Sequence, residues 1–325
     1  MRYLITGGAG FIGSHLADAL AARGDEVLIL DDLSTGRLEN VEGMNGAVEF
    51  VRGSVTDEAL VDECMASVDA CFHLASTVGV KLVVSQPLDS LLGDVHGIRT
   101  VVDAAARHDV RKLFTSTSEI YGKRSDGYVA EGADRLVGCP STARWNYSTA
   151  KSFGEALVQG YHRERAAEMV TVRLFNTVGP RQRGAYGMVL PRFVSQALAG
   201  EDLTVYGEGT QARCFGHVAD TVDALVRVMD SDRAVGGVFN IGCDREIQIV
   251  ELARQVVARS GSESEIRFVS YEDAYGEGFE ELGCRKPDTT RIREATGWEP
   301  SHTLEEAIDD TIEHHRMLGS PQVVG

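Results

Sequence analysis

The sequence predicts an α/β protein with a doubly wound parallel sheet and a smaller C-terminal lobe. Apolar strand segments alternate with amphipathic helical segments through the first half, a pattern typical of parallel sheets with crossover helices. The 325 residues, 43% apolar and including 35 glycines, suffice for a large core and many tight turns. The alternation loosens after Asn176. We therefore expect one domain over residues 1–176, with returns near 215–243, and a second lobe mainly over 177–325.

Each expected element rests on a short local pattern. Apolar runs predict a strand ahead of Gly7 and strands over 26–30, 48–51, 70–75, 112–116 and 169–174. Helical periodicity predicts helices over 98–108, 148–165 and 190–199. A short strand is expected over 203–206, and helices mixed with loops over 244–325. Because open parallel sheets bind ligands at the carboxyl ends of their strands, we expect the second lobe to face that edge.

The first turn carries the strongest functional signal. Gly7, Gly10 and Gly13 form a G-x-x-G-x-x-G spacing between the first strand and a helix. Such glycines let the backbone approach a pyrophosphate, and the helix N-terminus offers it free N–H groups; a plain tight turn is the alternative. The next strand ends at Asp31, where a carboxylate binds ribose hydroxyls and repels a 2′-phosphate. The sequence therefore predicts a dinucleotide site that prefers NAD to NADP.

Composition and charge argue against several partners. The formal net charge is −17 and no block of Lys and Arg occurs, so we expect no nucleic-acid binding. No apolar run reaches the ~20 residues of a membrane helix, and residues 1–13 lack a signal-peptide pattern. We therefore expect a cytoplasmic protein without membrane contact. The six cysteines include no C-x-x-C pair, so no metal site or disulfide framework is expected.

Tyr147 and Lys151 lie four residues apart in an expected helix, and therefore on one face. A free tyrosine, with a pKa near ~10, is a poor base at neutral pH. A neighbouring ammonium and a cationic nicotinamide ring stabilise the phenolate and lower that pKa. The pair then suits proton removal from an alcohol whose hydride passes to NAD. Alone the spacing is common on solvated helices, but behind a dinucleotide motif it predicts a catalytic base.

Taken together, the motifs resemble those of the extended short-chain dehydrogenase/reductases that modify nucleotide sugars. The resemblance covers nearly the whole chain and rests on Gly7-x-x-Gly10-x-x-Gly13, Leu30-Asp31, His73-Leu74-Ala75, residues 116–122, Tyr147-x-x-x-Lys151, residues 173–176 and residues 297–300. It implies a Rossmann fold, an NAD cofactor, a UDP-sugar substrate, and a homodimer built from two helices per subunit.

The resemblance also implies roles for individual residues. The implied catalytic residues are Thr117, Tyr147 and Lys151. The implied cofactor contacts are Gly7, Gly10, Phe11, Ile12, Gly13, Asp31, Asp32, Ser34, Thr35, Gly36, Ser54, Val55, Leu74, Ala75, Ser76, Ser116, Tyr147 and Lys151. The implied substrate contacts are Val80, Lys81, Thr117, Ser118, Glu119, Tyr147, Asn176, Val189, Leu190, Arg192, Val205, Tyr206, Gln211, Arg213, Arg285 and Asp288. Among them, Asn176, Arg213 and Arg285 resemble the residues that bind the nucleotide phosphates.

Three positions depart from the family pattern. Ser54 stands where an aspartate often contacts the adenine, and Asp94 stands where an asparagine is usual near the nicotinamide. Val78 replaces a lysine that reaches the cofactor phosphates in glucose-type epimerases. These departures leave the details of the cofactor contacts open.

Arg192 bears on the identity of the substrate. It opens an expected helix of the second lobe, where a guanidinium can hold a C5 carboxylate in a bidentate pair. A solvent-facing helix arginine is the alternative. Its segment resembles UDP-glucuronate 4-epimerases, so we predict NAD-dependent epimerisation of UDP-glucuronate to UDP-galacturonate through a 4-keto intermediate. The alternatives are a UDP-glucuronate decarboxylase that forms UDP-xylose, a UDP-glucose 4-epimerase, and a nucleotide-sensing regulator on the same fold. Ser118, which replaces the aspartate of dehydratases, disfavours dehydration.

Overall fold

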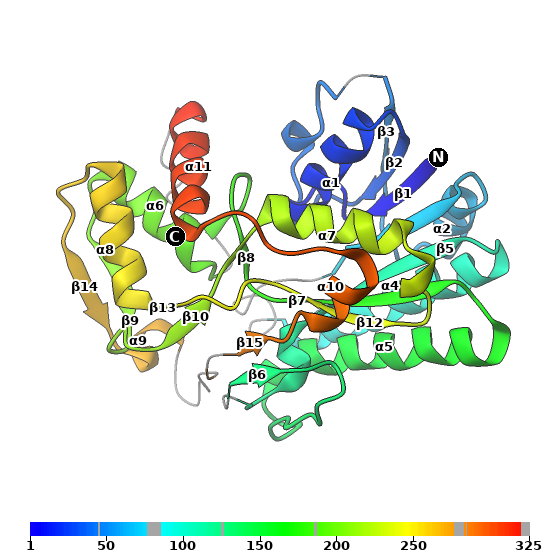
Figure 1. Ribbon diagram of the computed structural model, residues 1–325. Coiled ribbons are helices and arrows are strands. Elements are labelled where there is room, and N and C mark those ends of the chain that lie inside the picture. Colours follow the sequence, from blue (N-terminus) through cyan, green and yellow to red (C-terminus); the bar gives the residue numbers. More distant parts are fainter. Residues whose placement is uncertain are drawn as a thin grey trace.

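A seven-stranded parallel sheet forms the centre of the part of the chain that the structure describes (Figure 1). The structure is a computed structural model and describes residues 1–44, 46–76, 86–124, 127–184, 187–275, 283 and 285–319. In spatial order the strands are β12 (Val238–Ile241), β7 (Met169–Leu174), β5 (Arg111–Thr117), β4 (Ala70–His73), β1 (Arg2–Thr6), β2 (Glu26–Asp31) and β3 (Val48–Arg52). Since the chain order runs outward in both directions from β1, the predicted doubly wound sheet is confirmed.

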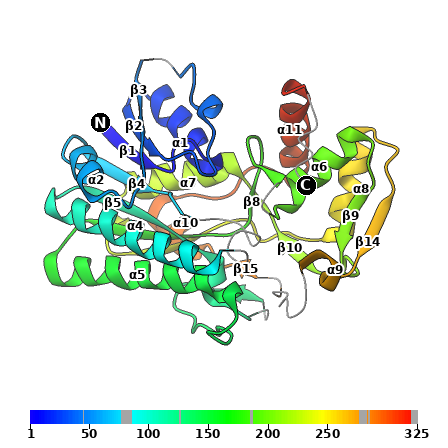
Figure 2. The ribbon, with the colours of Figure 1, turned by 180° about the vertical axis from the view of Figure 1, so that it is seen from behind.

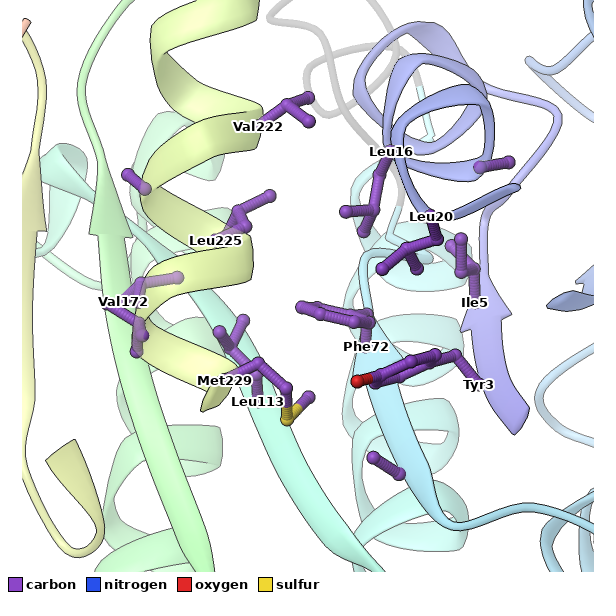
Figure 3. Packing of buried hydrophobic residues seen from close by; sticks show 14 of the residues in the cluster. Tyr3, Ile5, Leu16, Leu20, Phe72, Leu113, Val172, Val222, Leu225 and Met229 are labelled. Carbon is purple, nitrogen blue, oxygen red and sulfur yellow. The ribbon is translucent and has the colours of Figure 1, made fainter. Parts of the chain in front are cut away.

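Helices cover both faces of this sheet because alternate side chains of a strand point to opposite faces. One face carries α1 (Phe11–Ala22), α7 (Val218–Asp230) and α10 (Thr290–Thr296). The other carries α2 (Glu58–Met65), α4 (Pro87–Arg107) and α5 (Asn146–Arg165). Tyr3 and Ile5 of β1 pack into the first layer, whereas Leu4 packs into the second. Figure 3 shows the first layer, where Leu16 and Leu20 of α1 approach the same apolar cluster as α7.

The second lobe is a separate layer of helices beside the sheet (Figures 1 and 2). Its helices are α6 (Val189–Ala199), α8 (Ile249–Ser260), α9 (Tyr271–Tyr275) and α11 (Leu304–Met317). Its strand pairs are β9 (Leu203–Tyr206) with β14 (Ile266–Val269), and β10 (Ala212–Cys214) with β13 (Glu246–Gln248). Two shorter pairs, β8 (Thr177–Val178) with β11 (Gly216–His217) and β6 (Tyr128–Val129) with β15 (Lys286–Pro287), lie where the lobe meets the sheet. An apolar cluster shared by α6, α8 and α11 forms the core of this lobe.

The chain returns to the sheet after it has entered the lobe. Residues 216–241 supply β11, α7 and β12. A second return brings Ile292 of α10 and Trp298 into the core of the sheet, where the Trp298 indole N–H donates to the Asp220 carbonyl oxygen at 3.0 Å. The division at residue 176 stays a prediction, and the structure adds this second return to it.

Membrane helices, metal sites and disulfides can be assessed only for the described residues. No helix among them is both long and apolar enough to cross a membrane. They hold no group of three His, Cys, Asp or Glu side chains suited to a metal ion. The described cysteines are Cys64, Cys71, Cys139, Cys214 and Cys243, and all are free thiols.

Candidate active site

A cavity of ≈ 610 Å³ lies between the carboxyl ends of the sheet strands and the second lobe. The loops after β1, β2, β4, β5 and β7 form one wall, and α6, β9 and β10 contribute to the other. This position agrees with the general location of ligand sites in open α/β sheets. All the predicted site residues line the cavity except Gly36, Leu190, Val205 and Asp288, while Val80 and Lys81 lie outside the described residues. The binding roles of the lining residues remain predictions.

The positions of the four residues that do not line the cavity follow from their local packing. Leu190 and Val205 are fully buried in the core of the lobe, and the alternation along β9 turns Tyr206 toward the cavity instead of Val205. Gly36 packs behind Asp31, where a Cβ would come within 3.0 Å of both carboxylate oxygens. Asp288 accepts a hydrogen bond from the Thr290 N–H at the start of α10. These four residues therefore do not line the cavity, and their binding roles stay predictions.

The glycine turn after β1 fits a dinucleotide pyrophosphate. Gly7 has a φ of +74°, and a Cβ there would lie 2.8 Å from the Ala75 nitrogen. A Cβ on Gly13 would lie 2.3 Å from the Gly7 carbonyl oxygen, so the turn requires glycine at both positions. Helix α1 begins at Phe11 without a side-chain cap, which leaves its first N–H groups available to a phosphate.

Asp31 stands at the end of β2 in a fixed orientation. Its carboxylate accepts hydrogen bonds from the Ala9 N–H at 3.0 Å and from the Leu33 N–H at 2.8 Å. Burial raises the pKa of Asp31, although these two N–H donors oppose the rise. The carboxylate lines the cavity beyond the glycine turn, as a contact to ribose hydroxyls requires.

Thr117, Tyr147 and Lys151 meet at the opposite end of the cofactor wall. Thr117 ends β5, and the first two turns of α5 carry Tyr147 and Lys151. Lys151 is 1% exposed, and its ammonium donates to the Thr115 carbonyl oxygen at 2.9 Å and lies 5.7 Å from the centre of the Tyr147 ring. The hydroxyls of Thr117 and Ser76 act on the Tyr147 hydroxyl and lower its pKa. The predicted base, its hydroxyl partner and its lysine are therefore adjacent.

In this structure the pKa of Tyr147 lies above its ordinary value, and the lowering expected from Lys151 and a bound nicotinamide ring stays a prediction. Burial raises the pKa of Tyr147, and the carboxylates of Asp94 and Glu119 raise it further, against the hydrogen bonds of Ser76 and Thr117. Burial also lowers the pKa of Lys151 to about 8, with Asp94 opposing the fall. The effect of burial on these pKa values outweighs the attraction between the two side chains, and burial cannot be read from the spacing of two residues in the sequence.

Sequence reasoning missed the arginine that holds Glu119. The Arg144 guanidinium donates two hydrogen bonds to the Glu119 carboxylate, at 2.7 and 2.9 Å. Burial opposes ionisation of Glu119, but Arg144, Arg285 and Arg213 outweigh it, so the pKa of Glu119 lies below its ordinary value. Arg144 lies three residues before Tyr147, and this spacing was the available sequence signal.

Three further cavity residues had little sequence signal. Arg181 and Arg183 come from the loop after β8, and Tyr271 begins α9. Arg181 pairs with Asp18 of α1 at 2.8 Å, and the Arg183 guanidinium contacts the Thr35 carbonyl oxygen at 3.5 Å. The lobe thereby reaches the cofactor wall through contacts that are remote in sequence.

Arg192 lies in the first turn of α6 and lines the cavity. Its guanidinium carbon lies 4.0 Å from the centre of the Tyr206 ring, a stacking distance. One of its terminal nitrogens donates to the Thr204 carbonyl oxygen at 3.0 Å. The side chain is half-buried, so the alternative of a solvent-facing arginine is not what the structure shows.

Comparison with known proteins places this site in a family. The NAD dependent epimerase/dehydratase family matches residues 3–242. The chain belongs to this family. The predicted family and the predicted cofactor, NAD, are thereby confirmed, and the protein is an enzyme of this NAD-dependent group.

Relatives within the family carry different names. The chain is 39% identical over 318 residues to a UDP-N-acetyl-alpha-D-glucosaminuronate decarboxylase of Bacillus cytotoxicus, covering 98% of each chain. It is 37% identical to UDP-glucuronic acid decarboxylase 1 of Xenopus tropicalis, covering 97% of this chain and 72% of the relative. Among solved structures, a UDP-glucose 4-epimerase of Thermotoga maritima in complex with UDP-glucose has a TM-score of 0.87 and 28% identity, covering 98% and 99% of the two chains. Decarboxylases and epimerases are thus both similar to this chain.

Proposed function

We propose that this enzyme converts UDP-glucuronate to UDP-galacturonate by NAD-dependent 4-epimerisation. The observation that carries the proposal is Arg192, a guanidinium fixed by Tyr206 and Thr204 on the wall that faces the predicted catalytic residues. A planar, pre-oriented guanidinium matches a carboxylate in a bidentate pair. A sugar with a carboxylate at C5 meets that requirement, whereas glucose does not.

The first chemical step is oxidation of the sugar at C4. When bound along the cofactor wall, NAD would supply the acceptor for the hydride of the C4–H bond. Tyr147 removes the proton of the C4 hydroxyl, and Thr117 hydrogen-bonds the same oxygen. Lys151, held by the Thr115 carbonyl oxygen, places its positive charge beside the phenol. Epimerisation then requires the 4-ketosugar to turn over in the cavity before the hydride returns to its other face.

The nucleotide end of the substrate would occupy the lobe side of the cavity. Arg213 and Arg285 line that side, as do Asn176 and Gln211, in a protein whose formal net charge is −17. Arginines concentrated in a cavity of an acidic protein suit a diphosphate. The side-chain amide of Asn176 donates to the Cys214 carbonyl oxygen at 3.0 Å, which links β7's end to β10 beside these arginines.

Two features favour epimerisation over loss of carbon dioxide. The 4-keto form of glucuronate is a β-keto acid, and it decarboxylates best when the C5 to carboxylate bond stands perpendicular to the ketone plane. By holding the carboxylate near that plane, Arg192 slows the loss of carbon dioxide. Decarboxylation also leaves an enolate that must gain a proton at C5, and Glu119 is a poor donor because Arg144 holds it as a carboxylate.

Decarboxylation is the second candidate function. It is supported by 39% and 37% identity to two proteins named as decarboxylases, over almost the whole chain. Product analysis separates the two candidates. The purified enzyme is incubated with UDP-glucuronate, and the products are followed by NMR. We expect UDP-galacturonate as the main product. A predominance of UDP-xylose and carbon dioxide would establish the decarboxylase, and no turnover of any UDP-sugar would favour a regulator.

Arg192→Ala tests the role that carries the proposal. Loss of a charge-assisted contact worth about 1.5–3 kcal/mol should raise the KM for UDP-glucuronate roughly 10- to 150-fold. Binding of UDP-glucose, which lacks the carboxylate, should not weaken. Released UDP-xylose should increase relative to UDP-galacturonate.

Arg213→Ala is the matched control, because it removes a guanidinium from the predicted diphosphate end. It should weaken UDP-glucuronate and UDP-glucose to the same extent. Unchanged kinetics and an unchanged product ratio in Arg192→Ala would show that Arg192 does not contact the carboxylate.

We also propose that the enzyme is a homodimer formed through α4 and α5, as the family resemblance implies. Leu88 and Leu92 lie one turn apart on α4 and are 64% and 57% exposed, and Phe153 on α5 is also exposed. Exposed apolar side chains of this size on paired helices suit a subunit interface. Light scattering should give the mass of a dimer, and Leu92→Asp should give the mass of a monomer.

A further inference from the structure

The catalytic end of the cavity contains a buried carboxylate that the proposed mechanism does not use. Asp94, in α4, is 6% exposed and lines the cavity. Its Oδ1 accepts a hydrogen bond from the Ser76 hydroxyl at 3.0 Å. A carboxylate this deeply buried is costly unless neighbouring groups stabilise its charge, and Asp94 in turn favours the charged form of Lys151.

Asp94 and the catalytic pair share their surroundings. Ser76 donates to the Asp94 carboxylate and also lowers the pKa of Tyr147, and Ser76, Asp94 and Tyr147 all line the cavity. Lys151 lies beside Tyr147 on the same helix face, and α5 packs directly against α4. Asp94 therefore contributes to the electrostatic environment of Tyr147 and Lys151.

The other charged groups near this site are engaged elsewhere or act less directly. Glu119 faces Tyr147 but is paired with Arg144. His73 of β4 and Lys112 of β5 face Lys151, and burial holds the pKa of His73 well below its ordinary value. On the α2 side of α4, the charged pairs are exposed: Glu58 with His96 and Asp62 with Arg107.

We propose that Asp94 is a positioning residue that sets the proton distribution of the catalytic pair, keeping Lys151 charged and Tyr147 protonated to higher pH than a neutral side chain would. The proposal rests on the proposed catalytic roles of Tyr147 and Lys151. Its physical basis is a single negative charge in a water-poor site, where charges interact strongly. Burial lowers the pKa of Lys151 while Asp94 raises it, and burial and Asp94 both raise the pKa of Tyr147. Removing the charge should therefore lower both pKa values.

Asp94→Asn keeps the size of the side chain and removes its charge. The chain has five lysines, Lys81, Lys112, Lys123, Lys151 and Lys286, so a protein labelled with ¹³C at lysine Cε gives few NMR signals. The Lys151 signal is assigned by its absence from Lys151→Met. Lys151 should titrate near its pKa of about 8 in the parent protein and at least one unit lower in Asp94→Asn. That shift corresponds to about tenfold less ammonium at a given alkaline pH.

Two variants separate charge from hydrogen bonding. Asp94→Glu and Ser76→Ala both keep the carboxylate, and Lys151 should titrate near its parent value in each. If Asp94→Asn does not fold, Asp94→Ser removes the same charge and carries the same expectation. Titration of Lys151 at the parent pH in a folded, neutral Asp94 variant would overturn the proposal.

Turnover supplies a second, independent measurement. Turnover requires the Tyr147 phenolate together with the Lys151 ammonium, so the pH–rate profile depends on the pKa values of both groups. In Asp94→Asn both limbs of the profile should move to lower pH by about one unit, because both pKa values fall. In Ser76→Ala only the limb that reports Tyr147 should move, and it should move to higher pH, because Ser76 lowers the pKa of Tyr147. A profile that stays in place in Asp94→Asn contradicts the proposal. Absence of turnover with every UDP-sugar would instead refute the proposed function, and the lysine titration would still test Asp94.

Discussion

Lys112 allows a quantitative test of how burial controls charge in this fold. It lies in β5, its side chain is fully buried, and its ammonium has no hydrogen-bond partner among the described residues. Burial lowers the pKa of Lys112 from 10.5 to about 7, with Cys71 and Asp103 opposing the fall. Between these pH values the unfolded chain binds a proton that the folded chain does not. Stability against unfolding should therefore rise with pH across this window.

The size of the effect follows from the two pKa values. Their difference, 10.5 − 7, is 3.5 units, which at about 1.36 kcal/mol per unit sets a ceiling of roughly 5 kcal/mol. The loss of folding stability caused by burying Lys112 is fully present below pH 7 and disappears above pH 10.5. Lys112→Met keeps an unbranched apolar stem and removes the charge. The variant should be more stable than the parent by a few kcal/mol near pH 7, and the difference should shrink as the pH rises.

Urea unfolding of parent and variant from pH 6.5 to 9.5 measures this difference directly. Lys123→Met is the matched control, since Lys123 is exposed and its replacement should change stability little and equally at each pH. A Lys112→Met variant that is less stable than the parent, or whose advantage does not vary with pH, would refute the reasoning. The same ¹³C-labelled lysine signals would report the titration of Lys112 itself.

Other predictions concern the cofactor and the chemistry. Asp31→Ala should weaken NAD binding and reduce the preference for NAD over NADP, because it removes the carboxylate that repels a 2′-phosphate. Calorimetry measures the affinity for each cofactor. An unchanged ratio of the two affinities would exclude Asp31 from the ribose site. Tyr147→Phe should retain folding and NAD binding while kcat falls by about 10²–10⁴ or more, and a near-normal rate would remove Tyr147 from the mechanism. Thr117→Val, which removes one hydrogen bond to the phenol, should lower kcat by less than Tyr147→Phe, and an equal or larger loss would contradict its supporting role.

Local patterns in the sequence were enough for the fold and for much of the cavity wall. The glycines at 7, 10 and 13 and the carboxylate at 31 follow strands that any parallel sheet aligns at one edge, so their meeting could be predicted. Tyr147 and Lys151 share a helix face because the helical period is itself local. Val205 does not line the cavity, because a position in the sequence does not say which face of a strand meets it.

Tertiary packing alone decided the electrostatics of the site. The pairing of Glu119 with Arg144 and the stacking of Arg192 on Tyr206 join residues that no local period relates. Burial and the Asp94 carboxylate raise the pKa of Tyr147 through space, an effect that the spacing of Tyr147 and Lys151 did not indicate. Spacing along a chain reports which side chains share a face, whereas the energy of a charge depends on everything that surrounds it. For that reason the sequence could name the predicted reacting groups, and only the folded structure could show the surroundings that influence their charge.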